Sequence, residues 1–185
     1  MRNAIRTKVL VLILVLTFTS FFGSAQKGSS NKMKNVWSPP DKSFTVEVPV
    51  KLEEIKGEYD DISKEGYKSI QLFGSSEADV HYGVFEVVIL DLTEKEKLNV
   101  KGKMEGLEFF IGGDDQKSTK ETMVKVDGLT AKEVLFIGPN KCSKGLIIDA
   151  GDRIYVLGLA VNACKDLSSR VAKRFFITFH LMRRK

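Results

Sequence analysis

Alternating polar and apolar positions dominate the chain from residue 44 onward and predict a framework of β-strands. Apolar residues stand at every second position from Phe44 to Val48, and Pro49 ends the run, which is typical of a half-buried strand. Similar patterns, bounded by turn signals such as Asp127-Gly128, predict further extended segments. These lie near residues 52–58 and at 67–74, 121–126, 129–137, 144–149 and 153–161.

The segment from Val80 to Leu90 differs because it is apolar on both faces. One face carries Val80, Tyr82, Val84, Val88 and Leu90, and the other carries Phe85, Val87 and Ile89. A strand of this kind belongs in the middle of a sheet that is covered on both sides.

The hydrophobic period changes to that of a helix in two places. In the first, apolar residues at 100, 104, 107 and 111 follow a capping-box pattern at 93–96 and precede Gly112-Gly113, which predicts one helix. In the second, residues 167, 171 and 175 repeat every four positions, with Asp166 or Ser168 as the cap. Residues 176–182 are expected to form a short strand or a helix extension. Together these elements predict an α+β domain with an antiparallel sheet of about six or seven strands flanked by helices.

The first 25 residues have the composition of an export signal. Three basic residues precede an apolar run from Val9 to Phe22, and Gly23-Ser24-Ala25 supplies small residues for cleavage. This run is shorter than the roughly 20 residues that span a membrane, so we favour a cleaved signal over an uncleaved anchor. We therefore expect a periplasmic or extracellular protein. Its parts are a signal peptide at 1–25, a polar tether at 26–35, a single domain at 36–182 and a basic tail at 183–185.

The net positive charge of the sequence comes from residues 1–35 and 183–185. The sequence has 29 basic and 24 acidic residues, a formal charge of +5, which suggests a polyanion partner. Nine of the basic residues lie in 1–35 and 183–185, so residues 36–182 hold 20 basic and 24 acidic residues. We therefore expect no nucleic-acid partner. The better basic patch combines Arg170, Lys173 and Arg174 with Arg183, Arg184 and Lys185, and it is suited to weak contact with an anionic envelope surface or an acidic partner.

Two cysteines, Cys142 and Cys164, are the only ones in the chain. Oxidising compartments favour their pairing, and they fall near the open end of a hairpin formed by 144–149 and 153–161. A simple register places Cys142 opposite Val161, so the disulfide requires a bulge or a splayed end. The alternative is a pair of small buried residues, and a redox role is less favoured because the Cys-x-x-Cys spacing is absent.

Candidate catalytic groups are few. His81 shares a face with Phe85 and Val87, which is more typical of a packed histidine than of a base, and His180 lies close to the chain end. Two histidines and two cysteines do not form a zinc set, and the sequence has no phosphate-binding glycine loop. We expect no metal, no nucleotide cofactor and no enzymatic activity.

The function expected from these observations is binding to a protein partner that the sequence does not name. Trp37, the only tryptophan, is either a contact for that partner or, more simply, an anchor where the tether enters the domain. The alternatives are a small-ligand carrier or weak hydrolase with a cleft near Asp79, His81 and Tyr82, or an envelope-surface protein held by its basic patch. The oligomeric state is left open.

Four short motifs resemble landmarks of exported domains with the PsbP-like fold. They are Trp37 with the segment 41–49, residues 126–131, residues 152–157 and residues 174–179. The resemblance spans about residues 37–181 and implies a central antiparallel sheet between helices, an α/β/α sandwich. That fold is shared by an extrinsic photosystem II subunit and a Ran-binding nuclear import factor, which act by binding partners, and the resemblance implies no shared catalytic residues.

Overall fold

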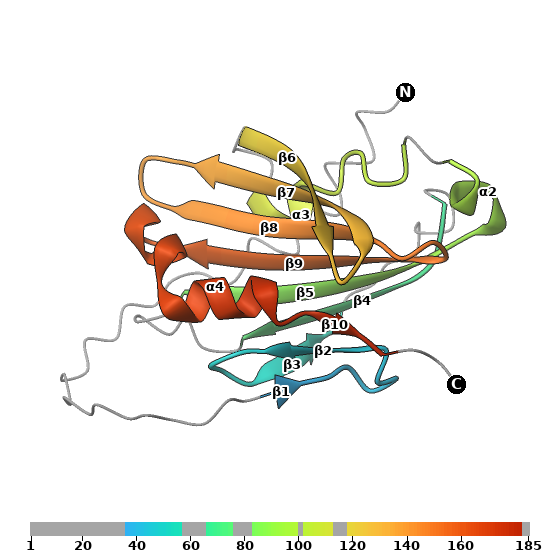
Figure 1. Ribbon diagram of the computed structural model, residues 1–185, viewed down its shortest axis with the longest axis horizontal. Coiled ribbons are helices and arrows are strands. Elements are labelled where there is room, and N and C mark those ends of the chain that lie inside the picture. The colour runs from blue at the N-terminus through green and yellow to red at the C-terminus, as the bar shows by residue number, and fades with distance from the viewer. Residues whose placement is uncertain (1–35, 57–65, 76–82, 100–101, 113–117, 183–185) are drawn as a thin grey trace. The chain divides into compact units, whose positions relative to one another are not determined.

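A seven-stranded antiparallel sheet forms the framework of the protein (Figure 1). The computed structural model describes residues 36–56, 66–75, 83–99, 102–112 and 118–182. The strands follow the order β3 (Leu52–Ile55), β4 (Tyr67–Ser75), β5 (Val84–Leu92), β9 (Arg153–Val161), β8 (Cys142–Asp149), β7 (Leu129–Ile137) and β6 (Ser118–Val126). This order confirms the predicted α+β class with an antiparallel sheet. The expected signal peptide, tether and basic tail lie outside the described residues.

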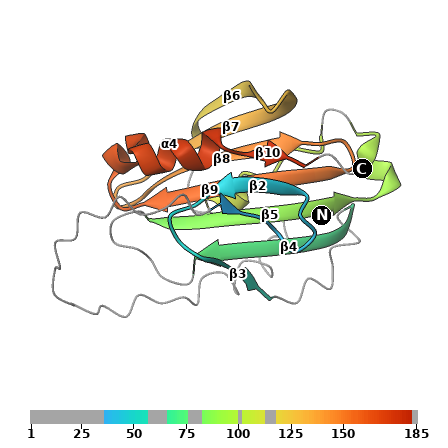
Figure 2. The same ribbon diagram turned by 60° about the horizontal axis from the view of Figure 1, so that its bottom comes forward.

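A second, smaller sheet lies over one face of the large one. Its order is β1 (Val36–Trp37), β2 (Phe44–Glu47) and β10 (His180–Leu181), and Figure 2 shows it in front of the long strands. The first and last parts of the described chain meet here, because His180 pairs with Thr45 and Leu181 with Phe44. The expected closing strand therefore exists, but it pairs with β2.

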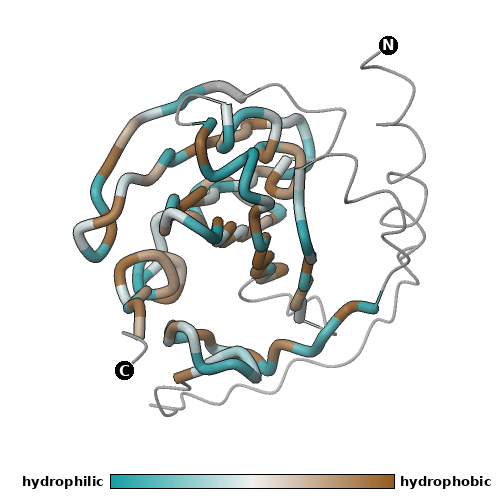
Figure 3. Tube along the Cα trace, turned by 90° about the vertical axis from the view of Figure 1, so that its right-hand side faces the viewer, coloured by the Kyte–Doolittle hydropathy of each residue, from teal (hydrophilic) through white to brown (hydrophobic). Residues whose placement is uncertain are grey.

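The two central strands are buried on both faces, as the sequence of β5 predicts. On one face, Phe85, Val87 and Ile89 join a core with Tyr155 and Leu157 of β9. On the other, a separate core includes Val88, Leu90, Ile154 and Val156. Figure 3, a view from the end of the molecule, shows hydrophobic and hydrophilic residues alternating along the chain. Each face must therefore be covered by another layer.

The first face is covered by the small sheet and by helix α4 (Arg170–Ile177), which follows the 3-10 helix η2 (Cys164–Ser168). The ring of Phe175 packs edge-on against Phe85, with ring centroids 4.9 Å apart. The expected caps, Asp166 and Ser168, are wrong. They fall within η2, so Ser169 caps α4 instead, and its hydroxyl accepts a 3.1 Å hydrogen bond from the Ala172 N–H.

The second face is covered by residues 102–112, and here the predicted continuous helix is wrong. The chain forms two single turns, α2 (Glu94–Lys97) and α3 (Phe109–Gly112), with turns at 102–108. Gly106 has φ +78°, a left-handed conformation that interrupts a helix. Leu107 and Ile111 are nevertheless buried on the sheet, so the apolar spacing identified the buried residues but not the backbone that carries them.

The small sheet is tied to the rest of the protein by two arginines. Arg174 of α4 makes a two-pronged ion pair with Glu47 of β2 through Nε and Nη2. Arg153 of β9, whose side chain is 12% exposed, bonds Asp91 of β5 and also Asp41, which precedes β2. Burial alone would raise the pKa of each of these two aspartates, but hydrogen bonds from Arg153 hold it below the usual 3.8.

No helix among the described residues is long and apolar enough to cross a membrane.

Replacing Arg153 with Met should lower the free energy of unfolding at neutral pH by about 1–3 kcal/mol, because Asp41 and Asp91 both lose their partner. The lowered pKa values mean that this stabilisation is present above about pH 4 and is lost as the pH falls further. Urea unfolding at several pH values checks this, with Arg153→Lys as the charge-preserving control. An equal difference from the wild type at neutral and strongly acidic pH would contradict the assignment.

Candidate functional site

The face of the sheet that carries α4 is not covered evenly. Two hollows of about 360 and 300 Å³ lie between strands β6 to β8 and the η2–α4 segment. Both are lined by Glu133, Lys144 and Leu167, so the two hollows adjoin at these residues. We call the pair of hollows the α4 groove and define it by Lys120, Glu133, Lys144, Leu167, Lys173 and Phe176.

The middle of the α4 groove is marked by an ion pair on the sheet. Nζ of Lys144 lies 2.7 Å from Oε2 of Glu133 and 5.2 Å from the ring centroid of Phe176 on α4. The two charged side chains are 26% and 35% exposed, so the pair is only partly screened by water. The aromatic contact adds a cation–π attraction and holds Lys144 between the sheet and the helix.

The remaining charges of the groove are unbalanced. Asp127 is already engaged, because its carboxylate accepts a 2.8 Å hydrogen bond from the Leu181 N–H and lies 3.2 Å from Nδ1 of His180. Lys120 and Lys173 are exposed, and within the part of the chain that the structure describes neither has an ion-pair partner. The available charge in the groove is therefore positive.

Apolar side chains lie exposed at both hollows. Ile177 of α4 lines the first hollow and is 77% exposed, and Ile137 of β7 lines the second and is 54% exposed. Single exposed apolar residues are ordinary, but two beside one trough are more typical of a surface that another molecule covers.

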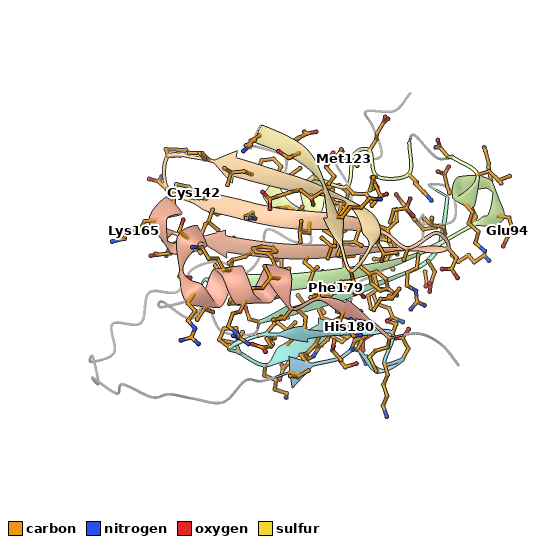
Figure 4. All side chains as sticks on the ribbon, in the orientation of Figure 1. Glu94, Met123, Cys142, Lys165, Phe179 and His180 are labelled. Atoms are coloured by element: carbon orange, nitrogen blue, oxygen red, sulfur yellow. A yellow bond between two sulfur atoms is a disulfide. The ribbon has the colours of Figure 1, made fainter. Side chains whose placement is uncertain are left out.

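A disulfide at the groove ties the helical wall to the sheet. Cys142, the first residue of β8, pairs with Val161 in the strand register, as expected from the sequence. The chain then leaves β9 and turns into η2, which brings Cys164 to disulfide distance, with Cα atoms 5.1 Å apart. Figure 4 shows Cys142 and Lys165 at the end of the sheet opposite Glu94. Cys164 and Leu167 both line the second hollow, so the disulfide fixes this wall.

The structure brings together few of the residues singled out in the sequence. Trp37 packs its ring against Phe44 and Phe73, with centroids 5.8 and 5.1 Å apart, and does not line the groove. His81, with Asp79 and Tyr82, lies outside the described residues.

The expected basic patch is divided. Arg174 is held by Glu47, whereas Arg170 and Lys173 are exposed. Residues 183–185, the rest of that patch, lie outside the described residues. His180 faces Asp127 at the groove end, and no group of three His, Cys, Asp or Glu in the described segments could hold a metal ion.

Most groove residues escaped sequence reasoning because they come from separate elements. One signal was present in the strand patterns. Glu133 stands between Ala131 and Leu135, and Lys144 stands two residues before Leu146, so both occupy inward positions of alternating strands. Charged residues at such positions mark a part of the sheet that its cover does not bury.

Glu86 of β5 is an unusual charge on the opposite face. Its strand neighbours are Gly74 and Gly158, and a Cβ at Gly158 would lie 3.7 Å from Cβ of Glu86. Burial raises the pKa of Glu86 despite the attraction of Lys141. Among the described residues it has no hydrogen-bond partner, so its ionised form is destabilising.

Comparison with solved structures assigns the fold to the PsbP-like class. The solution structure of cyanobacterial PsbP, CyanoP, from Synechocystis sp. PCC 6803 is similar with a TM-score of 0.53 and 11% identity. The similarity covers 86% of this chain and 98% of that chain. At this identity the likeness shows the fold alone, which confirms the fold-level resemblance expected from the sequence.

Two further structures have lower TM-scores and carry no argument. A protein from Bacteroides thetaiotaomicron gives 0.42 at 13% identity, covering 80% of this chain and 48% of that one. A Pseudomonas aeruginosa protein of unknown function, described as a putative regulator, gives 0.36 at 14% identity, covering 74% and 88%. No protein-family model matches the chain, and no curated protein matches it.

The raised pKa of Glu86 makes a prediction about pH. The folded state binds the carboxyl proton more tightly than the unfolded state, so stability should fall as the pH rises above about 4.5. Glu86→Gln removes this loss and should raise stability at pH 8 by roughly 1 kcal/mol, about 2–4 °C in Tm. Thermal unfolding across pH checks it. A variant whose gain is the same at pH 4 as at pH 8 would rule out ionisation as the cause.

Removing the disulfide by Cys142→Ser with Cys164→Ser should lower the free energy of unfolding by about 3 kcal/mol, since the bond closes a loop with a sequence separation of 22. Amide hydrogen exchange should accelerate in η2 while β4 and β5 stay protected. Intact mass after alkylation without reductant is the control. Uptake of two alkyl groups by the oxidised wild type would show that the pair is not formed.

Proposed function

We propose that this protein is an exported, non-catalytic binding or accessory domain that acts by contacting another protein. The observation that carries the proposal is the α4 groove, which is lined by exposed apolar residues and by lysines that have no ion-pair partner among the described residues. Surfaces that combine apolar contact area with charges at the rim are typical of protein–protein contacts.

Two features support export. The first 25 residues have a basic start, an apolar run and small residues before Gln26. The Cys142–Cys164 pair stands at disulfide distance, and such bonds persist in oxidising compartments outside the cytosol.

The chemistry of the groove favours binding over catalysis. Its thiol at Cys164 belongs to the disulfide, its carboxylate at Glu133 is bound by Lys144, and Asp127 is bound by the Leu181 N–H. These groups are committed to holding the walls together. The surface left for a ligand consists of apolar side chains, the Lys120 and Lys173 ammonium groups, the hydroxyls of Thr122 and Ser168, and Lys125, which bonds Thr130.

Attachment to an anionic envelope surface through the basic patch has less support. Arg174 is engaged with Glu47, which leaves only Arg170 and Lys173 of that set free within the described residues. Each of these two cationic side chains would contribute about 1 kcal/mol of binding free energy near an anionic membrane. Two such contributions give only weak binding.

Chemical crosslinking in the native envelope followed by purification tests the proposal. We expect a discrete adduct with one other protein, which persists when the crosslinker concentration is lowered. Recovery of the free monomer alone at every concentration would contradict a binding role.

A further inference from the structure

We propose that the α4 groove binds an extended segment of a partner protein that carries both acidic and apolar residues. This inference rests on the proposed function and specifies the chemistry of the partner.

The length of the groove calls for an extended ligand. Along β6 the lining residues run from Lys120 in the second hollow to Val126 in the first, and both hollows share Lys144. Six steps along a strand correspond to about 20 Å. A ligand that fills both hollows therefore matches about six residues of extended chain.

The charge of the groove calls for an acidic ligand. Lys120 on the sheet wall and Lys173 on the helix wall are exposed and lack ion-pair partners among the described residues, one in each hollow. Both lining acids, Asp127 and Glu133, are already engaged. A ligand with two carboxylates can form an ion pair with each lysine, whereas a basic ligand would be repelled by both.

The exposed apolar residues require the remaining ligand positions to be apolar. Ile177 and Ile137 each line one hollow, and Leu167 lies between the hollows and lines both. In an extended chain, successive side chains point to opposite sides. Each wall carries one lysine and one exposed isoleucine, so a ligand with both acidic and apolar residues on each of its two sides would match both walls.

Charge also argues against the chain's own tail as the occupant. The last three residues, Arg183, Arg184 and Lys185, are all basic and would be repelled by Lys173. A second copy of the chain is a distinct outcome that the experiments below detect.

The direct test is titration of the purified, isotope-labelled protein with a ten-residue peptide in which pairs of Asp alternate with pairs of Leu, so that each side of the extended chain carries both residue types. We expect amide shift changes confined to residues of both hollows, an affinity that falls with added salt, and no binding of a Lys-Leu peptide. Lys120→Glu and Lys173→Glu should each weaken binding about fivefold.

The matched control is Lys95→Glu, the same charge change at an exposed position of α2, at the far end of the sheet from η2 (Figure 1). Its affinity should equal that of the wild type. Equal weakening by all three substitutions would show a response to net charge only and would overturn the groove assignment. Shift changes scattered over the surface, or concentration-dependent dimerisation through the groove, would overturn it as well.

A photo-crosslinking side chain separates this inference from the proposed function. Placed at position 177 in the native envelope, it should attach to a segment of another protein that carries acidic residues. Placed at position 98, which directly follows α2 and is 82% exposed, it should attach to none. Adducts from position 98 alone would support binding to another protein but would refute the α4 groove as the binding site. Adducts from neither position would refute both.

Discussion

The burial of β5 and β9 on both faces is the constraint on which the rest of the structure depends. A strand pair with aliphatic and aromatic side chains on each side is stable only if two further layers exclude water from it. The chain supplies them from segments far apart in sequence, and Arg153 and Arg174 hold the N-terminal strands in the first of these layers. Phe44 and Val46 of β2 have no exposed surface in the resulting core.

The groove follows from the incompleteness of one of these layers. Helix α4 has eight residues, and together with β2 it covers the middle of the sheet fully but β6 and β7 only in part, since Ala131 is buried whereas Val124 and Val126 are partly buried. Where this cover ends, the strand positions on the same face carry Glu133 and Lys144 instead of aliphatic residues. These two side chains form an ion pair with each other. The disulfide keeps η2 against β8 at this boundary. The proposed binding surface thus lies where the core stops, apart from the residues that stabilise the fold.

Much of the fold could be predicted from the sequence because local alternation reports which side of a strand is buried. The turn at Asp127-Gly128 and the Cys142–Val161 register were both predicted and found. The helix expected at 100–111 was predicted but not found. The apolar spacing reflects the burial of Leu107 and Ile111, whereas the left-handed conformation of Gly106 interrupts the helix. The groove was missed because Lys120, Lys144 and Lys173 meet only after three distant elements pack, and no local pattern encodes that meeting.

The PsbP-like fold explains the sheet and its layers, whereas the function proposed above depends on what the α4 groove contacts. Lysine acetylation footprinting tests this most directly, by comparing the protein in its intact envelope with the purified protein. We expect Lys120 and Lys173 to be protected from acetylation in the envelope and to react after purification, whereas Lys95 should react equally in both states. Equal labelling of all three lysines in both states would contradict a role for the groove in partner binding.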